Sequence, residues 1–286
     1  MSISFTDRAL ELIMALVMSV STLFGSITQT VIVPQVQSQT TSPQSASRSV
    51  IDCAQLQLFD VPIVTPDMGD VECGILQVPE NWSKPDGRQI SITYVILKSA
   101  NPTPRADPIV YLEGGPGGSA LTGIDAYAGQ IFDEMRQDRD IVLFDQRGTQ
   151  FSSPLTCSIF TVDELFDSSM FGSGASANTV ELTPEFDEAQ LMDDARVSVG
   201  ADTRRCVNEL TASGIDLRQY NSVASANDAV ALMDALGYPT YNLFGISYGT
   251  RLALVLMRDH PDAGIRSVVL DSSFPPEIPG FERFVT

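Results

Sequence analysis

The chain has 286 residues, 43% of them hydrophobic and 19% charged, a composition that excludes a disordered chain and allows one substantial core. Its formal net charge of −19 excludes nucleic acid and anionic membrane surfaces as partners, because like charges repel. The acidic surface either attracts substrates with a free amino group or serves solubility alone, which is the more common use.

The first 49 residues have the order of an export signal. A short polar start containing Arg8 precedes a mostly apolar stretch at 12–27, and a Gln-, Ser- and Thr-rich run follows. We expect a cleaved signal peptide or an uncleaved N-terminal anchor at 1–29 and a flexible spacer at 30–51. Both interpretations place the remainder outside the cytosol, secreted or in the cell envelope, with membrane contact only through an uncleaved anchor. A buried helix of the fold is the alternative.

Four cysteines suit an oxidising compartment, and an even count permits two disulfides. Nearness in sequence favours Cys53 with Cys73 and Cys157 with Cys206 among the three possible connectivities. No pair has metal-ligand spacing and the chain has one His. We therefore expect neither a metal nor a cofactor.

From Glu72 onward, short apolar runs alternate with turns and then with helical patterns. The pattern predicts strands at 73–78, 90–97, 108–112, 141–144, 241–244 and 267–270, and helices at 120–135, 225–236 and 248–258. A Pro-Asp-Gly turn at Pro85–Gly87 joins the first two strands as a hairpin. The alternation implies an α/β fold with a mostly parallel sheet covered by helices on both faces. The acidic segment at about 158–202 has the composition of an insertion above the sheet.

The run from Gly245 to Gly249, GISYG, carries the strongest chemical signal. It lies between an expected strand and an expected helix, where a sharp turn raises a serine above a sheet. The flanking glycines, Gly245 and Gly249, leave room for such a turn. The helix that begins after Ser247 directs free N–H groups toward an oxyanion formed there. Ser247 is thus the expected nucleophile, and an ordinary turn between glycines is the alternative.

A glycine-rich run from Glu113 to Gly118, EGGPGG, directly follows the strand at 108–112. A loop with few side chains lets backbone N–H groups approach a ligand, as an oxyanion hole requires. We expect Gly115 and Tyr248 to provide the two donors, with the loop shaped by Gly114, Pro116 and Gly117. The Lys and Ser/Thr of a nucleotide-binding loop are missing, which argues against a phosphate site. A tight turn that packs on a neighbour is the remaining alternative.

The run from Asp145 to Thr149, DQRGT, follows the strand at 141–144. An Asp and an Arg at the carboxyl edge of a parallel sheet can lock neighbouring loops through charge-assisted hydrogen bonds. We expect Asp145 and Arg147 to support the floor of the pocket rather than to act in catalysis.

In this order, the three motifs resemble the peptidase branch of the α/β-hydrolases, which contains proline iminopeptidases and secreted tripeptidyl aminopeptidases. The resemblance extends from about Asp52 to the end and includes the Ser-Tyr-Gly-Thr run at Ser247–Thr250. It implies an α/β-hydrolase fold, a Ser247 nucleophile and a later lid that binds the amino end of the substrate. In proline iminopeptidases a His precedes the glycine run, whereas Glu113 stands here, which puts a strict preference for N-terminal proline in doubt.

The serine mechanism also needs a His base and an acid, which follow the nucleophile in chain order in this fold. The only His, His260, lies thirteen positions after Ser247, about 20 Å away along a helix that rises about 1.5 Å per residue. It cannot be the base, and we expect it to end the helix. Asp271 stays unassigned. We therefore expect an N-terminal portion of the hydrolase, incomplete at its C-terminus and inactive alone.

Three functions stay open at this point. The first is an exported aminopeptidase-type serine hydrolase that acts on small peptides. The second is an esterase with the same nucleophile and a small acyl substrate. The third is a non-catalytic binding or remnant protein that keeps the sheet without the base.

Overall fold

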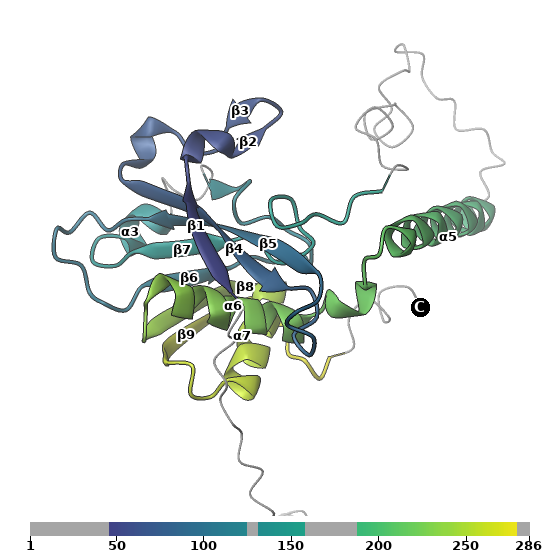
Figure 1. The fold of residues 1–286 in the computed structure, drawn as a ribbon. Helices are drawn as coiled ribbons and strands as arrows, with labels where there is room; N and C mark the ends of the chain where they lie inside the picture. Colours follow the sequence, from purple (N-terminus) through teal and green to yellow (C-terminus); the bar gives the residue numbers. More distant parts are fainter. Residues whose placement is uncertain (1–45, 125–130, 158–187, 279–286) are drawn as a thin grey trace, which may run out of the picture. The chain divides into compact units, whose positions relative to one another are not determined.

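The computed structural model describes residues 46–124, 131–157 and 188–278 (Figure 1). The apolar stretch at 12–27 and most of the acidic insertion expected at 158–202 lie outside these ranges. Within the described ranges, no helix is both long enough and apolar enough to cross a membrane.

Strands dominate the first half of the described chain, and the three long helices lie in the second half. The strands are β1 (Ser47–Ile51), β2 (Gln57–Leu58), β3 (Val61–Pro62), β4 (Val71–Pro79), β5 (Gln89–Leu97), β6 (Ile109–Leu112), β7 (Ile141–Phe144), β8 (Tyr241–Ile246) and β9 (Ile265–Asp271). The α-helices are α3 (Asp133–Met135), α5 (Glu188–Ala212), α6 (Ser222–Leu236) and α7 (Tyr248–Asp259). Short 3-10 turns are η1 (Cys53–Gln55), η2 (Pro66–Met68) and η4 (Leu217–Gln219).

Seven strands form one mixed sheet in the order β1-β4-β5-β7-β6-β8-β9 (Figure 1). Strands β7, β6, β8 and β9 are parallel to one another, whereas β1, β4 and β5 pair antiparallel. The predicted hairpin is present as β4 and β5. The predicted parallel pairing is confined to the strands β7, β6, β8 and β9. The structure therefore has the expected α/β architecture, with an antiparallel extension.

Side chains that alternate along the central strands build a core on each face of the sheet. Val110 and Leu112 of β6 pack in the core beneath α6 and α7, whereas Tyr111 faces the opposite core. That second core contains Leu121 and Phe132 from the segment expected as the helix at 120–135, of which 125–130 lie outside the described residues. Strands β6 and β7 are largely buried on both sides, as their continuous apolar sequences indicate.

Helices α6 and α7 have clear sequence reasons for their ends. The Asn221 side chain accepts hydrogen bonds from two N–H groups of the first turn of α6, and Gly237 ends it with φ 77°. A glycine in this left-handed conformation is the usual stop for a helix. Helix α7 ends at Asp259, with His260 as its C-cap, as expected.

The spacer expected at 30–51 ends earlier than predicted, because Ser47–Ile51 forms the edge strand β1. Arg48 of β1 donates a hydrogen bond to the Tyr94 hydroxyl at 2.6 Å. Tyr94 lies opposite Gly74 in the β4–β5 register, and a Cβ added at Gly74 would lie 2.1 Å from that hydroxyl oxygen. Gly74 thus leaves the space through which the buried tyrosine reaches the edge strand.

Both expected disulfides are formed. Cys53 pairs with Cys73, joining η1 to β4, and Cys157 pairs with Cys206 in α5. Helix α5 continues to Ala212, beyond the end of the expected insertion at 202. The second bridge therefore ties this helix to the loop that follows β7.

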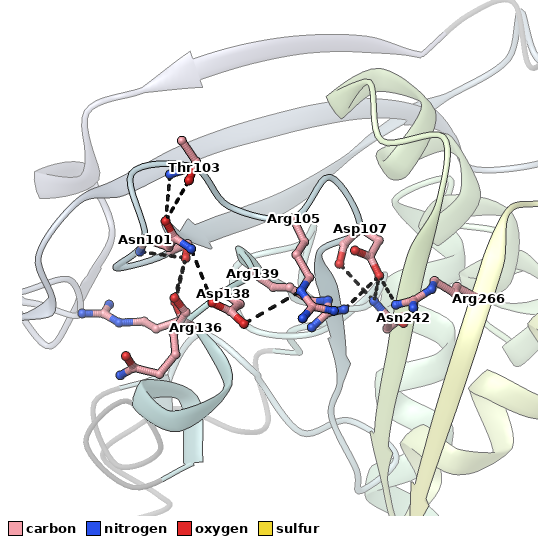
Figure 2. Close-up of polar contacts among 11 residues, drawn as sticks. Asn101, Thr103, Arg105, Asp107, Arg136, Asp138, Arg139, Asn242 and Arg266 are labelled. Atoms are coloured by element: carbon pink, nitrogen blue, oxygen red, sulfur yellow. Dashed lines mark hydrogen bonds and ion pairs between the residues drawn. The ribbon is translucent and has the colours of Figure 1, made fainter.

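A polar cluster fixes the amino ends of the parallel strands. In Figure 2, Arg139, Arg266 and Asn242 all point toward the Asp107 carboxylate, which is 13% exposed. Burial alone would raise the pKa of Asp107, but the hydrogen bonds from these three side chains outweigh it and lower the pKa to about 2. Asp107 thus connects the loop before β6 with β8 and β9.

We predict that Asp107→Asn destabilises the protein in a pH-dependent way. A carboxylate with a depressed folded-state pKa stabilises the fold above its unfolded pKa of about 3.9, and this contribution disappears as the pH falls through about 2. The urea midpoint of the variant should lie below that of the wild type at pH 7, and the gap should narrow from pH 4 downward. Asp86→Asn, in the exposed β4–β5 turn, is the control. A gap that is constant with pH would contradict the assignment.

Candidate active site

Ser247 occupies the sharp turn between β8 and α7. Its backbone has φ 51° and ψ −118°, an unusual conformation for a residue with a side chain, and the residue is exposed. The N–H of Ser247 donates to the Asp271 carbonyl at 2.9 Å, and its carbonyl accepts from the Thr250 hydroxyl at 2.6 Å. Strain of this kind costs roughly 1 to 3 kcal/mol and persists where the surroundings fix it, most often at functional sites.

The two glycines of the turn permit close backbone contacts. A Cβ added at Gly249 would lie 1.9 Å from the Leu112 carbonyl oxygen at the end of β6. A Cβ added at Gly245 would lie 2.6 Å from the carbonyl oxygen of Gly249. Gly245 is also paired with Leu112 in the parallel β6–β8 register. The first turn of α7 therefore lies directly against the strand that leads into the glycine-rich run.

The glycine-rich run lies next to the serine. A Cβ built on Gly114 would lie 3.1 Å from the Ser247 Cβ and 3.6 Å from its hydroxyl oxygen. Gly115 and Gly117 both have φ above 90°, and the three residues from Gly115 to Gly117 are exposed. The structure thus brings the two strongest sequence motifs together.

The backbone N–H groups of the glycine-rich run and of the serine turn differ in whether a protein acceptor is available. The Gly114 N–H donates to the Glu113 carboxylate at 2.7 Å and the Gly118 N–H to the Gly114 carbonyl at 3.3 Å, which leaves neither free. Within the described residues, the N–H groups of Gly115, Gly117 and Tyr248 donate to no protein acceptor. Tyr248 is the first residue of α7, where the N–H has no partner in its own helix.

Asp145 is fully buried just after β7 and connects two segments: the one that follows the glycine-rich run and the loop that follows β7. Its carboxylate accepts from the Ser119 hydroxyl at 2.8 Å and from the N–H groups of Leu121 and Phe151. Burial raises the pKa of Asp145, and these hydrogen bonds oppose the rise. Because Ser119 follows Gly118 directly, Asp145 fixes the distal end of the glycine-rich run.

Arg147 is buried as well and forms a bidentate ion pair with Asp228 of α6, both side chains being 1% exposed. It also donates to the carbonyls of Glu80 at 2.6 Å and Gln219 at 3.0 Å. Burial raises the pKa of Asp228, whereas hydrogen bonds from Arg147 and Trp82 oppose that rise. Arg147 thus joins the loop after β7 to α6, to η4 and to the residue after β4.

Neither His260 nor Asp271 completes a triad with the serine. The His260 ring lies at the opposite end of α7 from Ser247, with Nε2 2.9 Å from the Asn227 side-chain oxygen. Burial lowers the pKa of His260, and Asp259 opposes this effect. The Asp271 side chain is exposed and accepts from its neighbour Ser272.

Sequence reasoning missed two residues that connect the start of α7 to the segment after β9. The Thr250 hydroxyl bonds to the Ser247 carbonyl and accepts from the Phe274 N–H at 2.7 Å. Arg251 donates to the carbonyls of Pro275, Pro276 and Ile278. Thr250 belongs to the Ser-Tyr-Gly-Thr run, so the motif itself contained the signal. Arg251 offered no signal in the sequence, because its hydrogen-bond partners are backbone carbonyl groups.

A cavity of about 530 Å³ lies between the first turns of α6, the outer side of α7 and the residues after β4. Its lining includes Trp82, Asn227 and Arg258 but not Ser247. The strained serine and the glycine-rich run, rather than this cavity, therefore mark the candidate site.

A strained, exposed serine between a parallel strand and a helix, beside a glycine-rich loop, is the nucleophile position of α/β-sheet serine hydrolases. In keeping with this class, the sequence model of the α/β-hydrolase fold matches residues 107–284. This chain belongs to the α/β-hydrolase family.

Similar proteins include serine peptidases. Tripeptidyl aminopeptidase of Streptomyces lividans is 28% identical over 209 residues, which cover 72% of this chain and 36% of that protein. Serine protease Hip1 of Mycobacterium tuberculosis strain H37Rv is 27% identical over 217 residues, which cover 73% of this chain and 37% of that protein. The chain thus spans little more than a third of the length of these relatives.

Solved structures show a weaker likeness. Proline iminopeptidase of Mycobacterium smegmatis is 19% identical with a TM-score of 0.36, over 68% of this chain and 42% of that one. An epoxide hydrolase of Vigna radiata is 17% identical with a TM-score of 0.39, over 74% of this chain and 44% of that one. Neither adds to the family assignment.

We predict that Gly249→Ala displaces the serine turn. The new methyl group would overlap backbone atoms of Leu112, which cannot move aside as a side chain can. Overpacking of this kind destabilises proteins by about 1 to 3 kcal/mol, so the urea midpoint should fall. Gly200→Ala in α5, where an added Cβ meets no atom closer than 4.0 Å, is the matched control and should leave the midpoint unchanged or raise it. Equal midpoints for the Gly249 variant and the wild type would contradict the close contact.

Proposed function

We propose that this chain is the nucleophile-bearing part of an exported serine hydrolase of the aminopeptidase type. It would cleave short peptides near their amino end through an acyl-enzyme on Ser247. One observation carries the proposal: the exposed, strained Ser247 lies against Gly114, and the N–H groups of Gly115 and Tyr248 donate to no acceptor in the described part of the chain. The names of the serine peptidase relatives support a peptide substrate.

The proposed chemistry is acyl transfer in two steps. The Ser247 oxygen attacks the scissile carbonyl carbon, and the N–H groups of Gly115 and Tyr248 donate hydrogen bonds to the oxyanion that forms. A base accepts the serine proton and passes it to the leaving amine as the carbon–nitrogen bond breaks. Water then hydrolyses the ester on Ser247, which releases the amino-terminal product and regenerates the serine.

We propose that the base and its acid partner come from a segment outside the 286 residues. His260 is excluded because it lies thirteen positions after Ser247, beyond the far end of α7, about 20 Å away at 1.5 Å per residue. The share of the relatives that this chain covers is in keeping with further segments. On this proposal the 286 residues alone are inactive, and Asp145 and Arg147 support the pocket floor from beneath.

We further propose an extracytoplasmic location, secreted or in the cell envelope. Two disulfides, Cys53–Cys73 and Cys157–Cys206, suit an oxidising compartment. The apolar stretch at 12–27 would direct export. Partners are then small peptide or acyl substrates, with no nucleic acid and with a membrane only through an uncleaved N-terminal segment.

Turnover by the full-length protein tests this function. We expect hydrolysis of trialanyl anilide with a higher kcat/KM than that of a simple acyl ester such as p-nitrophenyl butyrate. Ser247→Ala should reduce kcat by about 10⁴-fold or more, because removing a nucleophile abolishes the covalent route. Ser272→Ala, an exposed serine outside the turn, should retain the wild-type rate. Hydrolysis of the ester alone would indicate an esterase, and turnover of neither substrate would indicate a non-catalytic protein.

A further inference from the structure

The carbonyl oxygen of Ser247 is held by two hydrogen bonds from a single residue. Thr250, in the first turn of α7, donates its N–H to this oxygen at 3.0 Å and its hydroxyl at 2.6 Å. A carbonyl oxygen has two lone pairs, so both acceptor sites are in use. Thr250 is 0% exposed, so its hydroxyl depends on protein partners.

The direction of the hydroxyl bond is set from outside the helix. A helical threonine often donates to a carbonyl three or four residues earlier, so this bond alone would not be distinctive. Here the Thr250 hydroxyl oxygen also accepts from the Phe274 N–H at 2.7 Å, in the segment after β9. Because a backbone N–H can only donate, the single hydroxyl hydrogen is left for the Ser247 carbonyl.

The segment that provides this N–H is itself fixed to α7. Arg251 donates to the carbonyls of Pro275, Pro276 and Ile278 at 3.3, 3.1 and 3.0 Å. Its guanidinium carbon also lies 5.1 Å from the centre of the Phe274 ring. The segment after β9 and the first turn of α7 therefore form one hydrogen-bonded unit, which fixes the donor to the threonine hydroxyl.

The Ser247 carbonyl and the Tyr248 N–H belong to the same peptide group. Such a group is planar and trans, so its oxygen and its amide hydrogen point in opposite directions and move together. The ψ angle of Ser247, −118°, is one of the two torsions about which this group would swing. Holding the oxygen at Thr250 therefore also fixes the direction of the Tyr248 N–H, which donates to no protein acceptor within the described residues.

We propose that Thr250 is a positioning residue that aims the Tyr248 N–H at the oxyanion. The proposal rests on the proposed function, because it needs an oxyanion formed at Ser247. Thr250 does not contact the substrate and acts only through the peptide group between Ser247 and Tyr248. The oxyanion forms as the reaction proceeds, so loss of the alignment lowers kcat and leaves substrate binding unchanged.

Variants of the full-length protein separate alignment from packing. Thr250→Val keeps the shape of the side chain and removes the hydroxyl, whereas Thr250→Ser keeps the hydroxyl and removes only the methyl group. Thr93→Val is the matched control, because Thr93 is also buried, at 3% exposed, and its hydroxyl donates to the Phe151 carbonyl. Each variant is assayed on trialanyl anilide, and its urea midpoint is measured separately.

We expect Thr250→Val to lower kcat by about 10-fold to 100-fold, since misplacing a reacting group by about 1 Å costs about 100-fold. Its KM should change by less than about threefold, as for an interaction made only in the transition state. Thr250→Ser should retain kcat within about threefold. Thr93→Val should lower the urea midpoint without lowering kcat. Thr250→Ala differs from Thr250→Ser only in the hydroxyl, so this pair gives the same comparison if the valine variant does not fold.

Three results would overturn the proposal. The first is an unchanged kcat in Thr250→Val, and the second is an equal loss in Thr250→Ser or Thr93→Val, since Thr250 would then only support the fold. The third is a loss of kcat/KM that lies in KM alone. If the wild type does not hydrolyse the anilide, the proposed function fails and this proposal fails with it.

Discussion

The contact between the first turn of α7 and the carboxyl end of β6 is the constraint on which the candidate site depends. The two backbones approach so closely at Gly249 and Leu112 that no side chain fits between them. Because β6 and β8 are adjacent and parallel, with Leu112 level with Gly245, the two strand ends stop at the same height. The glycine-rich run and the serine turn therefore meet without any long side chain to bridge them.

Buried or partly buried charge holds the two edges of the parallel sheet, while apolar side chains fill the layers between them. At the carboxyl edge, Arg147 with Asp228 joins the loop after β7 to α6, and Asp145 fixes the end of the glycine-rich run. At the amino edge, Asp107 joins the loop before β6 to β8 and β9. Removing one partner of a buried ion pair costs about 3 to 5 kcal/mol, so such pairs strongly favour one arrangement of the loops.

Much of the fold could be predicted from sequence because the signals are local. The strands at 108–112 and 141–144 were recognisable as short apolar runs, and the Ser247 turn was recognisable by its glycines. Edge strand β1 was missed, since its residues are mostly exposed and the strand exists only because β4 offers a pairing edge. Helix α5 was missed because its first part falls in the polar segment at 158–202, whose composition indicates an insertion above the sheet but no particular element.

The candidate site was predictable in its motifs but not in its long-range partners. Asp228 lies 81 residues from Arg147 in the sequence, and nothing in either local pattern pairs them. In the glycine-rich run, Gly114 packs against Ser247, whereas Gly115 was expected as an oxyanion donor; the two roles are compatible because they use different atoms. Backbone geometry decides such details, and residue spacing does not report it.

The central claim, that Ser247 is a reactive nucleophile beside an oxyanion site, is tested most directly by covalent labelling. The full-length protein is treated with a fluorophosphonate, and the modified residue is located by peptide mass spectrometry. A single adduct on Ser247, formed faster than on other serines and lost after denaturation before treatment, is the predicted result. An unmodified Ser247, or an adduct on another serine only, would contradict the account.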